Sequence, residues 1–286
     1  RHTLISSENA NSHIEALISE FCNGGENNLG DGTGEKAWAD PVVGFAAGDD
    51  SVFDDFKTYV GELHWTPKEI FELAFGVEID SHSLSVVSWI LPQTQETRRD
   101  NQQMERYPAE RWARSRIFGE TFNDQLRRYI EKTLTNEGYR AVSPMLAEGF
   151  HTRKSDTYQI VSTWSERHIA YACGLGTFGL CDGLITPVGK AVRFGSVVVE
   201  ISAMPATRPY TDHREYCLFD SNGRCGECIK RCPAGALSAS GHDKSLCGAY
   251  LREVTAPHVK SEYGFDGYGC GLCQTGVPCE SGIPVD

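Results

Sequence analysis

Cysteine spacing near the C-terminus constrains this chain more than any other feature of its sequence. Eight of the eleven cysteines fall between Cys217 and Cys279, a stretch of about a fifth of the 286 residues. Eight thiols divide into two sets of four, and four thiolates hold an iron-sulfur cubane or a structural zinc ion. The eight are Cys217, Cys225, Cys228, Cys232, Cys247, Cys270, Cys273 and Cys279.

The middle of this stretch favours iron-sulfur clusters. Cys225-x2-Cys228-x3-Cys232-Pro233 matches the second half of the ferredoxin run C-x2-C-x2-C-x3-C-P. In two-cluster ferredoxins the fourth cysteine of the run belongs to the other cluster, so we expect two 4Fe-4S clusters. The expected ligands are Cys217, Cys225, Cys228 and Cys279 for one cluster, and Cys232, Cys247, Cys270 and Cys273 for the other. Asn222 stands where the run has its first cysteine, so Cys217 must reach in over a longer loop.

Two other uses of the cysteines remain open. Paired CxxC elements bind zinc in many intracellular proteins, and eight cysteines could form four disulfides. Zinc sites rarely carry the Cys-Pro ending followed by the small residues Ala234, Gly235 and Ala236. Disulfide frameworks are typical of small secreted domains. Clusters are therefore preferred, and their oxygen sensitivity suits a reducing cytoplasm.

Composition and charge are those of an ordinary globular protein, with 40% hydrophobic and 23% charged residues. The length allows one large domain and one small domain. No apolar run approaches the ~20 residues of a membrane span. The net charge of -12 argues against a nucleic-acid partner, because phosphate binding depends on an excess of Lys and Arg.

Hydrophobic periodicity predicts interleaved helices and strands before the cysteine-rich tail. A capping box at Thr66-Pro67-Lys68-Glu69 predicts a helix from Pro67 to Phe75. Further helices are expected at 14–21, 101–138 and 165–173, and strands at 41–47, 83–91, 139–144 and 195–201. The cysteine-rich tail shows neither the helical nor the strand periodicity. We expect an N-terminal segment at 1–40, an α/β core at 41–208 and a small domain at 209–286.

The segment before the tail resembles a known family. Ser165-Glu166-Arg167, the run from Gly174 to Gly179 and the run from Gly183 to Pro187 resemble the corresponding region of cobalamin-dependent epoxyqueuosine reductases and reductive dehalogenases. In those proteins the segment also precedes two ferredoxin clusters. The resemblance implies a nitroreductase-like α/β (α+β) core followed by a C-terminal two-cluster ferredoxin-like domain, with a corrinoid buried beside the nearer cluster.

The resemblance also implies site residues. Catalytic candidates are Glu166 and Arg167, with Tyr139 added as a proton donor by its chemistry. Expected cofactor contacts are Gly174, Leu175, Gly176, Gly179, Leu184, Ile185, Thr186 and Pro187. Alternatively, the glycines make tight turns in a core, and Glu166 and Arg167 pair with each other on a helix flank. The letters Gly174-x-Gly176-x-x-Gly179 also match a dinucleotide fingerprint, but they follow a predicted helix instead of a strand.

Departures from the family pattern bear on the substrate. The family has an acid where this chain has 160–163, and an Asp-Tyr-His element where it has 120–123. Family members also commonly continue into a region that helps to hold transfer RNA, whereas this sequence stops seven residues after its last cysteine. We therefore expect a small organic molecule, or a protein-bound corrinoid, in place of transfer RNA.

The expected function is that of an iron-sulfur oxidoreductase. Two 4Fe-4S clusters would receive electrons from a ferredoxin- or flavodoxin-type donor and pass them to a cobalamin that reduces a small substrate. The alternative is an electron-transfer or corrinoid-activating protein without its own cobalamin. A flavin in the nitroreductase-like cleft is a third possibility.

Overall fold

The computed structural model describes residues 7–285, so the expected segment 1–40 begins outside the described residues. A four-stranded antiparallel sheet forms the centre of the fold. Its strands are β1 (Val42–Ala47), β2 (Ser85–Pro92), β8 (Val192–Val199) and β3 (Ala141–Val142), in this order across the sheet. Every residue of β2 is buried, as expected for a central strand covered on both faces.

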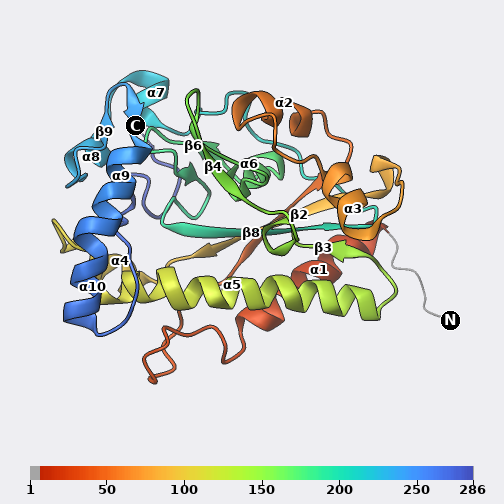
Figure 1. Ribbon diagram of the computed structural model, residues 1–286, viewed down its shortest axis with the longest axis horizontal. Helices are drawn as coiled ribbons and strands as arrows, with labels where there is room; N and C mark the ends of the chain where they lie inside the picture. The colour runs from red at the N-terminus through yellow and green to blue at the C-terminus, as the bar shows by residue number, and fades with distance from the viewer. Residues whose placement is uncertain (1–6, 286) are drawn as a thin grey trace.

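Helices α1 (Ser7–Cys22) and α5 (Glu110–Asn136) cover one face of the sheet (Figure 1). The four residues spaced four apart on α5 are buried against that face, which confirms the expected amphipathic helix. These residues are Phe122, Leu126, Ile130 and Leu134. Helix α5 therefore packs on one face of the sheet, across β2 and β8.

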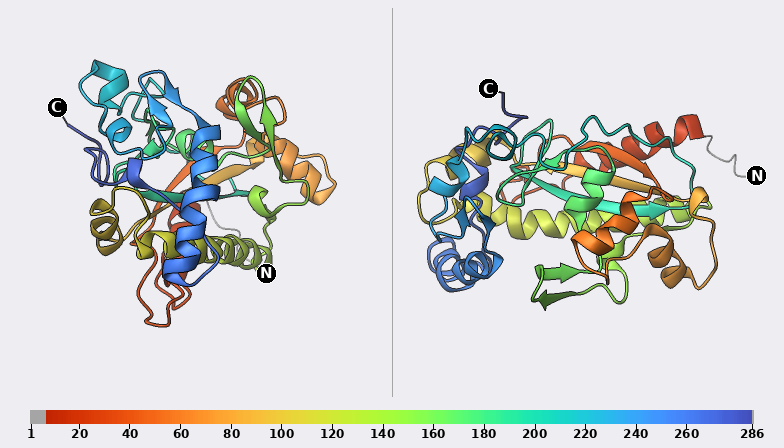
Figure 2. Two further views of the ribbon diagram at one scale, coloured as in Figure 1. Left: turned by 60° about the vertical axis from the view of Figure 1, so that its left-hand side comes forward. Right: turned by 90° about the horizontal axis from the view of Figure 1, so that it is seen from above.

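Helices α2 (Val52–Tyr59), α3 (Pro67–Phe75) and α6 (Glu166–Ala172) cover the opposite face (Figures 1 and 2). The capping box of α3 is formed: Thr66 Oγ1 accepts from the Glu69 amide at 3.2 Å, and Glu69 Oε2 accepts from the Thr66 amide at 2.8 Å. The helix has the predicted bounds because its start and its end at a left-handed Gly76 are both fixed locally.

The cysteine-rich part consists of short elements gathered at one end of the molecule (Figure 1). They are α7 (Leu218–Asn222), α8 (Glu227–Lys230), β9 (Leu237–Ser238), β10 (Gly241–His242), α9 (Lys244–Tyr250), η3 (Leu251–Thr255), α10 (Ala256–Tyr263) and η4 (Leu272–Gln274). Arg231 ties this part to α4 (Gln95–Gln102) and the loop after it, donating to the carbonyls of Asn101 at 3.2 Å and Met104 at 2.9 Å.

The remaining short elements surround the sheet. They are η1 (Ser81–Ser83), η2 (Pro144–Leu146), β4 (Thr152–Ser155), β5 (Gln159–Ser162), β6 (Thr177–Phe178) and β7 (Leu184–Ile185). Strands β4 and β5 form an antiparallel hairpin that projects from the body of the molecule (Figure 2).

Two predicted boundaries are wrong. The helix expected at 101–138 is interrupted between α4 and α5, because Pro108 lacks an amide hydrogen and disfavours a helical residue before it. The strand expected at 139–144 has only two residues, since Pro144 cannot continue the ladder.

The fold is mixed α/β, as the sequence predicted. No helix among residues 7–285 is both long and apolar enough to cross a membrane.

Candidate functional site

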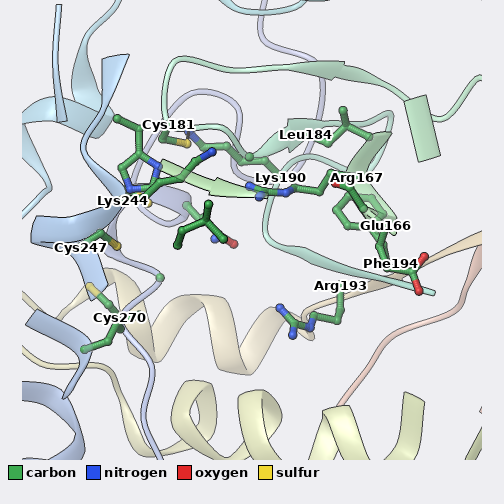
Figure 3. Close-up of a pocket in the computed structure, with 18 of the residues that line it drawn as sticks. Glu166, Arg167, Cys181, Leu184, Lys190, Arg193, Phe194, Lys244, Cys247 and Cys270 are labelled. Atoms are coloured by element: carbon green, nitrogen blue, oxygen red, sulfur yellow. Dashed lines mark hydrogen bonds between the residues drawn. The ribbon is translucent and has the colours of Figure 1, made fainter. Parts of the chain in front are cut away.

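A cavity of about 790 Å³ opens between the sheet and the cysteine-rich part (Figure 3). Strand β8, helices α5 and α6, the β4–β5 hairpin and the C-terminal elements all contribute to its lining. Its volume is within the range of ligand pockets that hold drug-sized or larger molecules.

The two expected sets of cysteines line two different cavities. The large cavity is lined by Cys232, Cys247, Cys270 and Cys273. A second, small cavity is lined by Cys217, Cys225, Cys228 and Cys279. Within each set two cysteines lie three residues apart, at 225/228 and at 270/273, and the other two come from elsewhere in the chain. All eight are free. Their role as cluster ligands remains a prediction.

The arrangement of these thiols bears on which metal group they suit. In the described residues, no group of three or more His, Cys, Asp or Glu is arranged to hold a single metal ion. A cubane needs its four thiols farther apart than one ion does, because iron and sulfide atoms lie between them. The preference for a cubane over a zinc ion at each set of thiols stays a prediction from the sequence.

Cys181 lies between the two sets, which its sequence position did not reveal. It is buried and lines the large cavity. Interactions with Cys228 of one set and Cys273 of the other hold the pKa of Cys181 well below its usual value. No spacing signal connects residue 181 with the C-terminal run, so only the fold brings it there.

Lys190 supplies a positive charge beside Cys181. Its side chain is buried, and its Nζ lies 3.3 Å from the Sγ of Cys181. Burial lowers the pKa of Lys190, but the neighbouring thiols, Cys181 and Cys279 foremost, outweigh it and raise the pKa above its ordinary value. Lys190 therefore keeps its positive charge beside the thiols.

The backbone at Lys190 joins the core to the C-terminal segment. The Lys190 amide donates to the Cys279 carbonyl at 2.9 Å, and the Ala191 amide donates to the Glu280 carbonyl at 3.2 Å. Gly189 makes this close approach possible, because a Cβ there would lie 2.1 Å from the Glu280 carbonyl oxygen. These contacts fix Cys279 relative to β8.

Glu166 lies on the cavity wall at the start of α6 and is held from two sides. Its Oε1 accepts from Arg127 Nη2 at 3.0 Å, and its Oε2 accepts from Ser196 Oγ at 2.6 Å. Burial raises the pKa of Glu166 although Arg127 opposes this effect. The idea that Glu166 pairs with Arg167 is wrong, because Arg127 on α5 is its partner.

Arg167 points into the large cavity together with two other arginines. It donates to the Asp182 carbonyl, Arg116 donates to the Tyr268 hydroxyl at 2.8 Å, and Arg193 pairs with Glu120. Burial lowers the pKa of Arg167; Asp182 and Cys181 oppose this effect, and the charge of Arg193 adds to it. Arg116 and Arg193 come from α5 and β8, so sequence spacing gave no sign that they meet Arg167.

The other predicted site residues lie mostly outside the cavity linings. Leu184 lines the large cavity and Ile185 the small one. Neither cavity is lined by Tyr139, Gly174, Leu175, Gly176, Gly179, Thr186 or Pro187. Tyr139 packs against the core on the α1–α5 side of the sheet instead.

The glycines have a backbone role. Gly174 follows α6 with a left-handed φ of 78°. At Gly176 a Cβ would lie 2.2 Å from the Ile185 carbonyl oxygen, so only glycine permits this approach. The alternative of tight turns in the core therefore describes both residues.

Comparisons with known proteins were made for both sequence and fold. No protein-family model matches the chain. Epoxyqueuosine reductases of Bacillus cereus and Bacillus anthracis are each 33% identical over 125 residues, which is 42% of this chain and 30% of the relative. That of Staphylococcus aureus is 31% identical over 128 residues, 43% of this chain and 31% of the relative. The match spans less than a third of each curated relative.

Two solved structures share the fold. An epoxyqueuosine reductase crystallised with a tRNA-Tyr stem loop has a TM-score of 0.51 and 17% identity, covering 98% of this chain and 68% of that one. The catabolic reductive dehalogenase NpRdhA has a TM-score of 0.50 and 14% identity, covering 95% of this chain and 36% of that one.

The fold is thus one found in an epoxyqueuosine reductase and in a reductive dehalogenase, and in this chain it contains a cavity with cysteines in its wall. The resemblance of this chain to the epoxyqueuosine reductases and reductive dehalogenases, predicted from 165–187, is confirmed by the comparisons. One expectation needs correction. A protein of this fold was crystallised with an RNA stem loop, so a net charge of -12 does not by itself exclude nucleic acid.

Proposed function

We propose that this chain is an iron-sulfur reductase that passes electrons through two 4Fe-4S clusters to a corrinoid in the large cavity, where a small organic molecule is reduced. The proposed division is a nitroreductase-like core at 41–208 and a ferredoxin-like domain at 209–286. A ferredoxin- or flavodoxin-type donor would supply electrons in a reducing compartment such as the cytoplasm.

The observation that carries the proposal is the shared cavity. Four cysteines of the second set line the same 790 Å³ cavity as Glu166 and Arg167. A cluster held by those cysteines would therefore face the space in which a ligand binds. Electron transfer and substrate binding would share one enclosed volume, which is the arrangement that a reductase needs.

A corrinoid, when bound, would supply a reducible cobalt centre. The residues of the chain would control protons and water around it. Burial raises the pKa of Glu166 against the opposing charge of Arg127, so this carboxylate is suited to accept and return a proton at the cavity wall. Ser196 fixes its Oε2, and Trp164 Nε1 donates to the same Ser196 hydroxyl at 2.9 Å. The indole of Trp164 helps to exclude water from this wall.

Anaerobic reconstitution with iron, sulfide and cobalamin tests the proposal. Gel filtration and absorption spectra should give about one corrinoid per chain, and chemical analysis about eight irons and eight sulfides. A stable two-cluster protein that refuses cobalamin would instead support the electron-transfer alternative. About two tightly bound zinc ions, one for each set of thiols, would contradict the cluster assignment.

A pair of cysteine variants localises the metal. Cys228→Ala should lose about half of the iron, because it removes a ligand of one proposed cluster. Cys22 is a matched control, since it is also buried but lies at the end of α1 in the main core. Cys22→Ala should keep the full iron content, and equal losses in the two variants would count against the proposed ligand set.

A further inference from the structure

The charges around the large cavity are unlike those of the molecule as a whole. The chain has a net charge of -12, yet the cavity lining contains six Lys or Arg side chains and two carboxylates. The carboxylates are Glu120 and Glu166, and the cations are Arg116, Arg127, Arg167, Lys190, Arg193 and Lys244. A cationic cavity inside an acidic protein attracts anions to one place.

The two carboxylates of the lining already form ion pairs. Arg127 is 1% exposed and pairs with Glu166 at 3.0 Å and Glu120 at 3.2 Å. Arg193 reaches the other oxygen of Glu120. Both negative charges of the lining are therefore engaged by these two arginines, and Arg127 also pairs with Asp124, outside the lining, at 2.7 Å. Of the other cations, Lys190 lies among thiols and Lys244 lies 3.9 Å from Asp182.

Arg116 and Arg167 are left without a carboxylate partner. Within residues 7–285, no Asp or Glu lies within ion-pair distance of either side chain. Arg116 donates to the Tyr268 hydroxyl and stacks over its ring, 4.8 Å from the centroid. Both guanidinium groups are half-buried, and Arg193 repels both of them. Glu120 and Asp182 stabilise the charges of Arg116 and Arg167, respectively, only from beyond ion-pair distance, so an anion that contacts the two guanidinium groups would relieve the repulsion.

We propose that Arg116, Arg167 and Arg193 form an anion-binding site for the substrate, which is a small organic carboxylate or phosphate. This inference rests on the proposed function and names the substrate class of the same cavity. Figure 3 shows Arg167 and Arg193 pointing into one space from α6 and β8. Guanidinium groups match the paired oxygens of carboxylate and phosphate, and such charge-assisted hydrogen bonds are the strong ones.

The rest of the lining indicates the body of the ligand. Trp112, Phe150, Trp164 and Leu184 contribute apolar surface to the cavity wall. Apolar walls bury a hydrocarbon or aromatic body, while a few placed charges fix its orientation. An anion with an apolar body therefore fits better than a sugar or a fully polar molecule.

Titration calorimetry on the full chain, reconstituted with iron, sulfide and cobalamin, tests the proposal with benzoate and its neutral isostere benzamide. Benzoate should bind roughly tenfold more tightly or better. Arg167→Gln and Arg116→Gln should each abolish that preference. Arg140→Gln is the control for the loss of one positive charge, because Arg140 pairs with Glu200 and lies outside the cavity. Equal affinities, no binding, or a preference that survives in both cavity variants would overturn the proposal.

The same experiment distinguishes other sources of the anion. Cobinamide lacks the nucleotide phosphate of cobalamin, so protein loaded with either corrinoid should show the same preference if the arginines serve the substrate. A preference found only with cobinamide, together with loss of cobalamin from Arg167→Gln, would assign the arginines to the cofactor phosphate and overturn the proposal. Displacement of benzoate by an anticodon stem-loop RNA, lost in both cavity variants, would also overturn it in favour of RNA.

Iron and corrinoid contents of each sample separate this proposal from the proposed function. A chain that prefers benzoate through its arginines but refuses cobalamin contradicts the reductase and keeps the anion site. A fully loaded chain that does not distinguish benzoate from benzamide contradicts the anion site alone.

Discussion

At the scale of single residues, Lys190 has an unusual position. A buried ammonium is costly unless nearby negative charge compensates it, and the side chains that compensate it are thiols from both sets. If these thiols hold clusters, the ammonium stabilises the reduced form of each cluster more than the oxidised form, because reduction adds negative charge.

Replacing Lys190 should therefore lower cluster potentials. Lys190→Met keeps most of the side-chain volume and removes the charge, so we expect a shift on the order of tens of millivolts to more negative values. A potentiometric titration followed by electron paramagnetic resonance measures it. Lys230→Met is the control, since Lys230 is near Cys225 but its side chain is 73% exposed and screened by water. Equal shifts in the two variants would refute the role of burial.

At the scale of elements, the sequence predicted the helices whose ends or buried faces depend on residues close together in the chain. The capping box and a C-terminal glycine fix α3, and the spacing of Phe122 and Leu126 fixes the buried face of α5. The site is different, because Arg116, Arg167 and Arg193 meet only through packing of α5, α6 and β8. The cysteine sets are intermediate, since ferredoxin spacing predicted their grouping but gave no sign of Cys181 between them.

The capping box should contribute measurably to stability. Thr66→Ala removes the side-chain acceptor for the Glu69 amide, and we expect a loss of about 1 kcal/mol in the free energy of unfolding. Urea denaturation under anaerobic conditions measures it. Thr135→Ala serves as the control, because Thr135 is exposed near the end of α5 and caps no helix. A comparable loss in both variants would mean that the cap adds nothing specific.

At the scale of the whole molecule, two buried histidines make stability depend on pH. Burial lowers the pKa of His64 to about 4 and that of His168 to about 3. Both side chains pack against Phe56 beneath the large cavity. Because an unfolded histidine titrates near pH 6.5, the unfolded chain binds more protons below that value. Their contribution to stability is present above pH 6.5 and declines as the pH falls toward 4.

The histidine contribution can be isolated with one variant. Lowering the pH from 7 to 5 should cost about 2 kcal/mol of unfolding free energy through His64 alone. His64→Gln keeps an acceptor for the Ser165 amide, which donates to His64 Nε2 at 3.1 Å, and cannot titrate. The variant should therefore lose less stability than the wild type over this interval in paired urea titrations. An identical pH dependence would contradict the assignment.

The backbone contacts at Lys190 and Ala191 also bear on biosynthesis. Cys279 is held by hydrogen bonds to the segment that directly precedes β8, and the ribosome adds it 62 residues after Cys217. A nascent chain would therefore present three thiols of the first set before the fourth has a fixed position. If the first set holds a cluster, its insertion would follow the docking of residues 279–280 beside the sheet, so iron delivery would come late in maturation.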